Sequence, residues 1–206
     1  MGPSHIKRFE CVFGDEWLNF KALLIESGSV VAGSFLLQCI LDETWHYSTK
    51  TGFPYIDIYL PVPESEHHFT KLNSWICKHF AYHSQITDTG QSEILNIYIY
   101  VSQQKNYKNP LVSDVESTNN PTPILMPAIR TYCLNIPLCE TEQFLRTYYK
   151  MDVNRNVFGF SSVGKPFLRI NNLQQILSKQ IRMSTDIDFN PEMTKTLYIK
   201  HGFAFL

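Results

Sequence analysis

Residues 30–41 read VVAGSFLLQCIL, and residues 55–60 read YIDIYL. The first stretch predicts a short apolar run that turns through Gly33-Ser34 into a buried helix, because the residues after the turn are apolar nearly all round. The second predicts a strand with one apolar face, since side chains alternate between faces along an extended chain. Asp57 lies on the opposite face, between two tyrosines.

Length and composition predict a single domain without a strong charge. The chain has 206 residues, of which 44% are apolar and 14% aromatic, enough to bury a sizeable core. Only 18% are charged and the formal net charge is -1, so no general field attracts nucleic acid or an acidic membrane. The five cysteines form no CxxC pair and sit mostly in apolar runs, which favours reduced, buried thiols in an intracellular protein. We expect neither secretion nor membrane spanning, because a signal-peptide pattern and a long apolar run are missing.

The periodicity of the remaining sequence predicts helices that alternate with strands. Helices are predicted over 17–27, 65–83, 140–149 and 173–181, with one more helical segment near the C-terminus. Strands are predicted over 94–101, 130–136, 151–158, 167–170 and 201–206. Asp15 is expected to cap the first helix. The polar segment 102–123 has no sustained period and is expected to form an insertion loop within the domain.

This order of elements resembles the nucleotidyltransferase fold of the DNA polymerase beta superfamily. The motif of that family is an apolar residue, Gly, Gly or Ser, a spacer, and two carboxylates separated by one apolar residue, with a third carboxylate on a later strand. Ala32-Gly33-Ser34 matches the first part, residues 55–58 align with the second, and Asp152 corresponds to the third carboxylate. The resemblance implies an α+β fold in which helices pack on a small mixed β-sheet.

A closer resemblance is to poorly characterised nucleotidyltransferase-like proteins of large DNA viruses of amoebae and of fungi. These proteins have a Gly-Ser-Phe turn before an apolar helix, an Asp-Ile-Asp-Ile-type strand, a Phe-Asp strand after a helix, and an aromatic-x-x-basic-Gly-Phe ending. The corresponding stretches here are 33–41, 55–59, 144–152 and 198–203. For a viral member, the resemblance implies a virion or infection-stage protein, located in the virion or in the cytoplasm.

The superfamily resemblance implies a role for each matching residue. Gly33 and Ser34 would bind nucleotide phosphates at the N-terminus of the following helix. Asp57 and Asp152, with a further carboxylate at position 55, would hold Mg²⁺ and catalyse transfer from an NTP. Tyr55 breaks this pattern, because a phenol with a pKa near about 10 is a poor ligand for a hard dication at neutral pH. The spacer before Tyr55 is also longer than is usual in the family.

The sequence therefore favours a degenerate nucleotidyltransferase-fold protein, catalytically weak or inactive, that acts as a binding or assembly component with a protein partner or with itself. An active Mg-dependent nucleotidyltransferase using Asp57 and Asp152 is the first alternative. A nucleotide or nucleic-acid binder without chemistry is the second. It would use a tyrosine-rich sheet face, which consists of Tyr55, Tyr59, Tyr98 and Tyr100. Coverage of this face by the 102–123 loop or by the C-terminal segment fits the sequence equally well.

Two other groups of residues are weaker candidates. Residues 186–188 spell Asp-Ile-Asp but precede Asn190-Pro191, which is typical of a turn. The predicted helix over 65–83 is rich in histidine and includes His79 and His83 at one-turn spacing, a spacing that suits a shared metal. A structural zinc needs four ligands, so partly exposed histidines on an amphipathic helix are the simpler interpretation.

Overall fold

The computed structural model describes residues 4–45, 55–61, 66–86, 94–102, 128–183 and 192–206. Its centre is formed by the 30–41 and 55–60 stretches, in which the predicted apolar run before the turn is a strand. β1 (Val30–Ala32) leads through Gly33 into α3 (Ser34–Leu41), and β2 (Tyr55–Pro61) returns antiparallel beside β1. These elements agree with the sequence pattern.

The other elements surround this unit. The remaining helices are α1 (Ser4–Phe13), α2 (Trp17–Ser27), α4 (Glu66–His79), α5 (Leu138–Tyr148), α6 (Leu173–Leu177) and α7 (Glu192–Lys200). Two short 3-10 helices are η1 (Gly14–Glu16) and η2 (Asp152–Asn154). The remaining strands are β3 (Phe80–Ile86), β4 (Ile94–Ser102), β5 (Ala128–Leu134), β6 (Val157–Phe160), β7 (Pro166–Arg169), β8 (Gln180–Ile181) and β9 (Ala204–Phe205).

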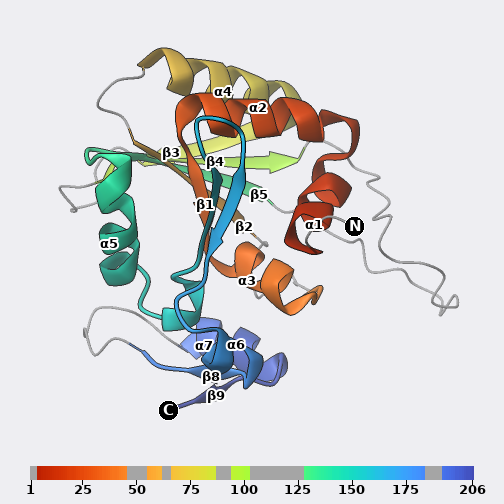
Figure 1. The fold of residues 1–206 in the computed structure, drawn as a ribbon, viewed down its shortest axis with the longest axis vertical. Coiled ribbons are helices and arrows are strands. Elements are labelled where there is room, and N and C mark those ends of the chain that lie inside the picture. Colours follow the sequence, from red (N-terminus) through yellow and green to blue (C-terminus); the bar gives the residue numbers. More distant parts are fainter. Residues whose placement is uncertain (1–3, 46–54, 62–65, 87–93, 103–127, 184–191) are drawn as a thin grey trace, which may run out of the picture.

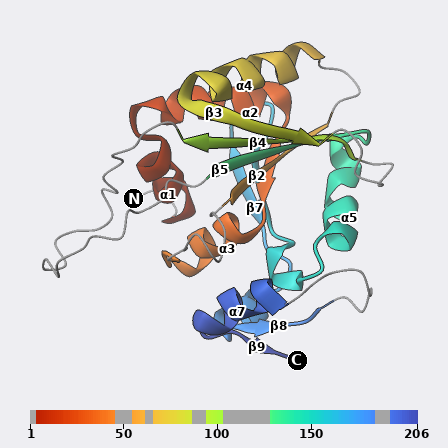
Figure 2. The ribbon, with the colours of Figure 1, turned by 180° about the vertical axis from the view of Figure 1, so that it is seen from behind.

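Seven of these strands form one mixed sheet in the order β3-β4-β5-β2-β1-β6-β7 (Figure 1). Within it, β2 and β5 run parallel, and every other neighbouring pair is antiparallel. Seen from behind, β3 and β4 lie beside α4 (Figure 2). β8 and β9 form a separate two-stranded parallel sheet near the C-terminus. The expected α+β fold, with helices packed on a mixed sheet, is confirmed.

Four helices cover one face of the sheet and build the largest core. Its centre is aromatic: Phe9 of α1 is fully buried, and its ring centroid lies 5.2 Å from those of both Phe35 and Phe158. Ile56 and Ile58 of β2 project into this core, together with side chains of α2 and α4. The apolar face predicted for β2 is therefore the face that these helices bury.

Helix α5 covers the opposite face of the sheet and lies across the molecule from α1 (Figure 1). Phe144 and Leu145 of α5 pack there against Tyr59 and Tyr132 of the two parallel strands. Both faces of the central strands are consequently buried, and the tyrosine face predicted for β2 is not an open surface at Tyr59.

The last third of the chain adds a smaller core below the sheet, where α6, α7, β8 and β9 gather (Figure 1). Leu37 of α3 and Met151 contribute to it, so it is continuous with the central unit. The hydroxyl of Tyr198 donates a hydrogen bond to Asn154 Oδ1 at 2.8 Å. Tyr198 belongs to the aromatic-x-x-basic-Gly-Phe stretch, which thus contributes to this core.

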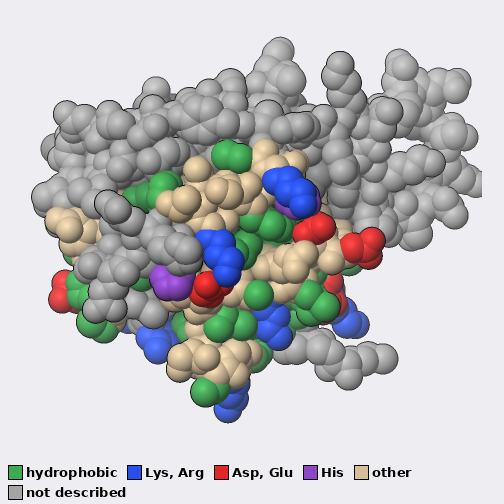
Figure 3. Space-filling view, turned by 90° about the horizontal axis from the view of Figure 1, so that it is seen from above, with side chains coloured by type: hydrophobic (Ala, Val, Ile, Leu, Met, Phe, Trp, Pro, Cys, Tyr) green, Lys and Arg blue, Asp and Glu red, His purple; other side chains and the backbone are tan. Residues whose placement is uncertain are grey.

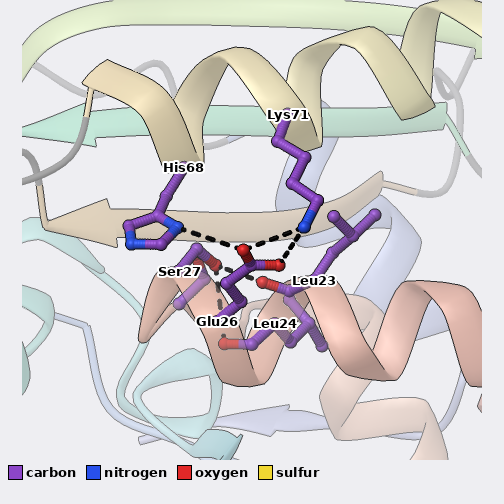
Figure 4. A network of polar contacts seen from close by, with 7 residues as sticks. Leu23, Leu24, Glu26, Ser27, His68 and Lys71 are labelled. Carbon is purple, nitrogen blue, oxygen red and sulfur yellow. Dashed lines mark hydrogen bonds and ion pairs between the residues drawn. The ribbon is translucent and has the colours of Figure 1, made fainter.

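Helices α2 and α4 are also joined by ion pairs at the surface (Figure 4). Glu26 of α2 accepts two hydrogen bonds from Lys71 Nζ, at 2.8 and 2.6 Å, and lies 3.7 Å from His68. Basic, acidic and histidine side chains are interspersed on the described part of the face seen from above (Figure 3). Exposed pairs of this kind contribute little to stability. Among the described residues, no helix has the length and apolar content that crossing a membrane requires.

Several predicted elements differ from those observed. The helix predicted over 65–83 ends at His79, and the chain continues directly into β3, whose residues hydrogen-bond to β4. The strand predicted over 151–158 is divided, because residues 152–154 form η2 and only residues 157–160 pair in the sheet. The helix predicted over 173–181 ends at Leu177.

The N-terminal boundary of α2 also differs from the prediction. Asp15 does not cap the helix, because residues 14–16 form η1 directly before α2 and Glu16 occupies the N-cap position. Helix α1 was not predicted at all. The predicted insertion loop beyond Ser102 and the Asp-Ile-Asp stretch at 186–188 lie outside the described residues.

Candidate functional site

Asp57 is where the Gly33 turn, two parallel strands and the end of α5 meet. In the sheet it lies opposite Ala32 of β1 on one side and Arg130 of β5 on the other. Its side chain is only 2% exposed. A carboxylate this deeply buried must be matched by a cation or by hydrogen-bond donors, because desolvation of its charge is costly.

Arg130 provides that match through a two-point contact. Its Nε donates to Asp57 Oδ1 at 2.6 Å and its Nη2 donates to Asp57 Oδ2 at 2.9 Å. This bidentate geometry gives the strongest type of carboxylate–guanidinium pair. Burial alone would lower the pKa of the Arg130 guanidinium, but the charge of Asp57 and the hydrogen bonds to it outweigh this, and the pKa is raised well above its ordinary value. The guanidinium is therefore permanently charged, and 29% of its side chain remains exposed.

Tyr55 packs against this pair. The Cζ atom of Arg130 lies 4.0 Å from the centroid of the Tyr55 ring, which is cation–π geometry. Tyr55 is half-buried and shares a sheet face with Asp57, two residues away. Tyr55, which stands where the resemblance would place the first carboxylate, thus packs against the Arg130 guanidinium.

A chain of two phenols completes the surroundings of Asp57. Tyr149, directly after α5, donates to Asp57 Oδ2 at 3.0 Å, and the Tyr59 hydroxyl donates to the Tyr149 hydroxyl at 2.7 Å. Burial raises the pKa of both phenols well above the ordinary value, and for Tyr149 the neighbouring Asp57 charge raises it further. Both hydroxyls therefore stay protonated and act as donors at neutral pH.

Gly33 passes so close to this cluster that it has no room for a side chain. It adopts φ 85° and ψ -164°, a region essentially restricted to glycine. A Cβ atom here would overlap Asp57 Oδ2 and would lie 2.8 Å from the Tyr149 hydroxyl. The N–H of Gly33 donates to the carbonyl of Asn154 at 3.3 Å, and Ser34 is half-buried as the first residue of α3.

Asp152 lies in η2 and makes contacts of a different kind. Its Oδ2 accepts a short hydrogen bond from Gln175 Nε2, and its Oδ1 accepts from the backbone N–H of Arg182 at 3.0 Å. The side chain thereby fastens η2 to α6 and to the end of β8. None of these partners is shared with Asp57, so the two predicted metal ligands serve separate contact networks.

The donor set does not fit the Mg²⁺ ions that the resemblance implies. Both oxygens of Asp57 accept hydrogen bonds from Arg130, and both oxygens of Asp152 accept hydrogen bonds from protein N–H groups. Among the described residues, no group of three or more His, Cys, Asp or Glu side chains is arranged to hold a metal ion. A guanidinium beside Asp57 also repels a dication.

The two histidines of α4 whose side chains are described lie near acidic residues of the preceding elements. His68 lies near Glu26, and His79 Nε2 lies 3.6 Å from Glu16 Oε2. His83 lies in β3, so its predicted one-turn spacing from His79 does not occur. The side chains of His67, His83, Tyr98 and Tyr100 lie outside the described ones.

Arg130 and Tyr149 are the two residues of this site that the sequence interpretation missed. Arg130 lies in a predicted strand, and its alternation with Tyr132 was a signal that its side chain shares a face with a tyrosine. Nothing in the sequence pairs that strand with β2, which is 73 residues away at this contact. Tyr149 follows the predicted helix and carries no local motif.

The fold resembles that of solved nucleotidyltransferases. The sequence matches no protein-family model and no curated protein. A CCA-adding enzyme in an apo form has a TM-score of 0.54 and 11% identity, over 98% of this chain and 42% of that one. A CCA-adding enzyme in complex with CTP has a TM-score of 0.54 and 9% identity, over 98% and 43%. At this identity the likeness concerns the nucleotidyltransferase-like fold alone, and the chain spans less than half the length of these enzymes.

We predict that Gly33→Ala destabilises the protein far more than Gly14→Ala. Both glycines have positive φ, but a Cβ at Gly14 would meet nothing within 4 Å. The control should lose about 1 kcal/mol for the backbone conformation, and Gly33→Ala about 2 kcal/mol more because of its restricted backbone and the overlap with Asp57. Urea unfolding of both variants measures this difference. Equal losses would show that Asp57 and Tyr149 do not crowd Gly33.

We also predict that stability is lost at alkaline pH through the buried phenols. Burial raises the folded-state pKa of Tyr59, Tyr132 and Tyr149, whereas unfolded tyrosines ionise near about 10. Their contribution is therefore fully present below about pH 10 and falls as pH rises further. Phenolate absorbance should show these three ionising only together with loss of the near-ultraviolet circular dichroism signal. Tyr149→Phe should remove one late-ionising group, and ionisation of all tyrosines before unfolding would contradict the burial described here.

Proposed function

We propose that this chain is a degenerate nucleotidyltransferase-fold protein, catalytically weak or inactive, and that it acts as a binding or assembly component. The observation that supports this is the bidentate pair between Asp57 and Arg130. In the family that the sequence resembles, the carboxylate at position 57 would bind metal. Here the Arg130 guanidinium, and not a metal ion, provides the positive charge beside the Asp57 carboxylate.

The position of Arg130 strengthens the proposal. β5 is a direct neighbour of β2, and Arg130 is the residue in register with Asp57. A two-metal clamp needs carboxylates that face one another across adjacent elements. On this face the residue opposite Asp57 on β5 is the cation Arg130. Tyr55, two residues before Asp57 on β2, packs against the Arg130 guanidinium. Transfer chemistry through Asp57 would require Arg130 to leave first.

Binding of an NTP without chemistry is the second candidate. One of the structurally similar proteins is a CCA-adding enzyme in complex with CTP, and the structural match extends over 98% of this chain. Ser34 at the start of α3 and the exposed part of the Arg130 side chain are the groups that would meet a nucleotide phosphate. The N–H of Gly33 contributes less, because it already donates to Asn154.

We propose that residues 1–206 form one domain, in which the segment around 102–123 is an insertion. The resemblance to proteins of large DNA viruses and fungi supports an assembly role, which in a virus would be in the virion or during infection. A protein partner or a second copy of the chain would be the binding target.

We predict that the purified protein transfers no nucleotide from labelled ATP, CTP, GTP or UTP in Mg²⁺ or Mn²⁺ beyond the level of Asp57→Asn. The reason is that Asp57 is committed to Arg130. Metal-dependent transfer that disappears in Asp57→Asn and in Asp152→Asn would instead establish the active alternative.

Calorimetric titration with each NTP and sedimentation analysis of the same samples separate the remaining candidates. Nucleotide binding without turnover supports the second candidate, whereas self-association without nucleotide binding supports assembly. A monomer that binds no nucleotide and no protein from its source would contradict both.

A further inference from the structure

A cavity of about 530 Å³ is lined by residues from the cores on both faces of the sheet, and Asp57 is not among its lining residues. It is bounded by the β6–β7 hairpin, the C-terminal end of α2 and the first turn of α5. Val30, three residues before Gly33 on β1, forms part of its wall. Its volume falls within the range of cavities that hold small organic ligands, about 300–1,000 Å³.

The hairpin builds the apolar wall of this cavity around Gly159. A Cβ atom at Gly159 would lie 2.8 Å from the Phe167 ring and 3.1 Å from the Val30 side chain. The absence of a side chain thus lets the Phe167 ring lie across β6. Val157 belongs to the same cluster as Val30 and Phe167, whereas Phe160, which also lines the cavity, belongs to the core on the other face of the sheet. The hairpin turn is fixed by hydrogen bonds between Ser161 and Lys165.

The polar groups of the cavity favour an anion at one end. Arg169 lines it, and the Arg169 Cζ atom lies 5.2 Å from the centroid of the Phe167 ring, so the positive charge borders the apolar wall. Among the described residues that line the cavity, none is a carboxylate. The Thr141 hydroxyl donates to the carbonyl of Pro137, and Arg169 is the one charged side chain among the described residues that line the cavity.

We propose that this cavity binds a small amphipathic anion, with an acyl or aromatic body against Phe167 and Val30 and a carboxylate near Arg169. The apolar wall supplies affinity through burial, and the guanidinium supplies selectivity for the charged end. The site does not depend on the proposed nucleotidyltransferase ancestry, because none of its lining residues contacts Asp57 in the network described above. Its failure and the failure of the proposed function are therefore independent.

The first test compares decanoate with decanol, two probes with the same chain and different head groups. Calorimetric titration should detect decanoate binding to the full chain, and Arg169→Gln should weaken it about tenfold or more while changing decanol binding less than about twofold. Arg146→Gln is the matched control, since Arg146 is exposed on α5 and does not line the cavity. No decanoate binding, or equal loss for both probes in Arg169→Gln, would overturn the proposal.

Alkylation of the cysteines can test where the probe binds. Cys139 and Cys77 are both exposed, but only Cys139 lines the cavity. Cys39 and Cys133 are buried, which raises the pKa of each thiol to about 12 and makes both poorly reactive. Decanoate should slow the alkylation of Cys139 by iodoacetamide and leave that of Cys77 unchanged.

A bulky side chain at the same position gives an independent check of the location. Cys139→Trp should abolish decanoate binding, because the indole fills the cavity, whereas Cys77→Trp should not. Because both positions are exposed, neither substitution disturbs the core. Equal protection of the two thiols, or unchanged binding in Cys139→Trp, would place the probe elsewhere and overturn the proposal.

Discussion

A carboxylate that is only 2% exposed, among apolar and aromatic side chains, needs a cation and donors to remain charged. Asp57 finds them in Arg130 from the neighbouring strand and in Tyr149 from the end of α5. These contacts fix the lateral position of β5 against β2 and the position of α5 on the sheet. Gly33 must lack a side chain for the same reason, because its backbone closes the remaining side of the cluster.

Asp152 plays a comparable part in the lower third of the molecule. Its two oxygens accept from Gln175 and from the backbone of Arg182, so it links η2 to the C-terminal elements. Asp57 and Asp152, the two acidic residues for which the sequence resemblance predicts metal binding, each accept hydrogen bonds from protein donors. The fold is thereby compatible with the nucleotidyltransferase scaffold, while the charge arrangement at its centre favours a stable ion pair over a metal centre.

The local parts of this structure were predictable from the sequence, and the distant pairings were not. The turn and helix after the apolar run at 30–32 and the strand at 55–60 were predicted from the glycine, the apolar residues and the alternation, and the structure contains both; that the apolar run is itself a strand was not predicted. Tyr55 led to the prediction of a degenerate metal site, and this stays a prediction. Arg130 was missed because its partner is remote in sequence, and β3 was missed because residues 80–83 continue a helical apolar spacing until pairing with β4 decides otherwise. The sequence suggested that the 102–123 loop or the C-terminal segment covers the tyrosine face, whereas in the structure α5 packs over Tyr59.

The most direct test of the account is a double-mutant cycle on the ion pair, with Asp57→Asn, Arg130→Gln and the combined variant measured by urea unfolding. We predict a coupling free energy of about 1–3 kcal/mol. Arg130→Gln should be the more destabilising single change, because it leaves a carboxylate that is only 2% exposed without its cation, whereas 29% of the Arg130 side chain is exposed and water can reach it in Asp57→Asn. A coupling free energy indistinguishable from zero would contradict the claim that Asp57 is held by Arg130.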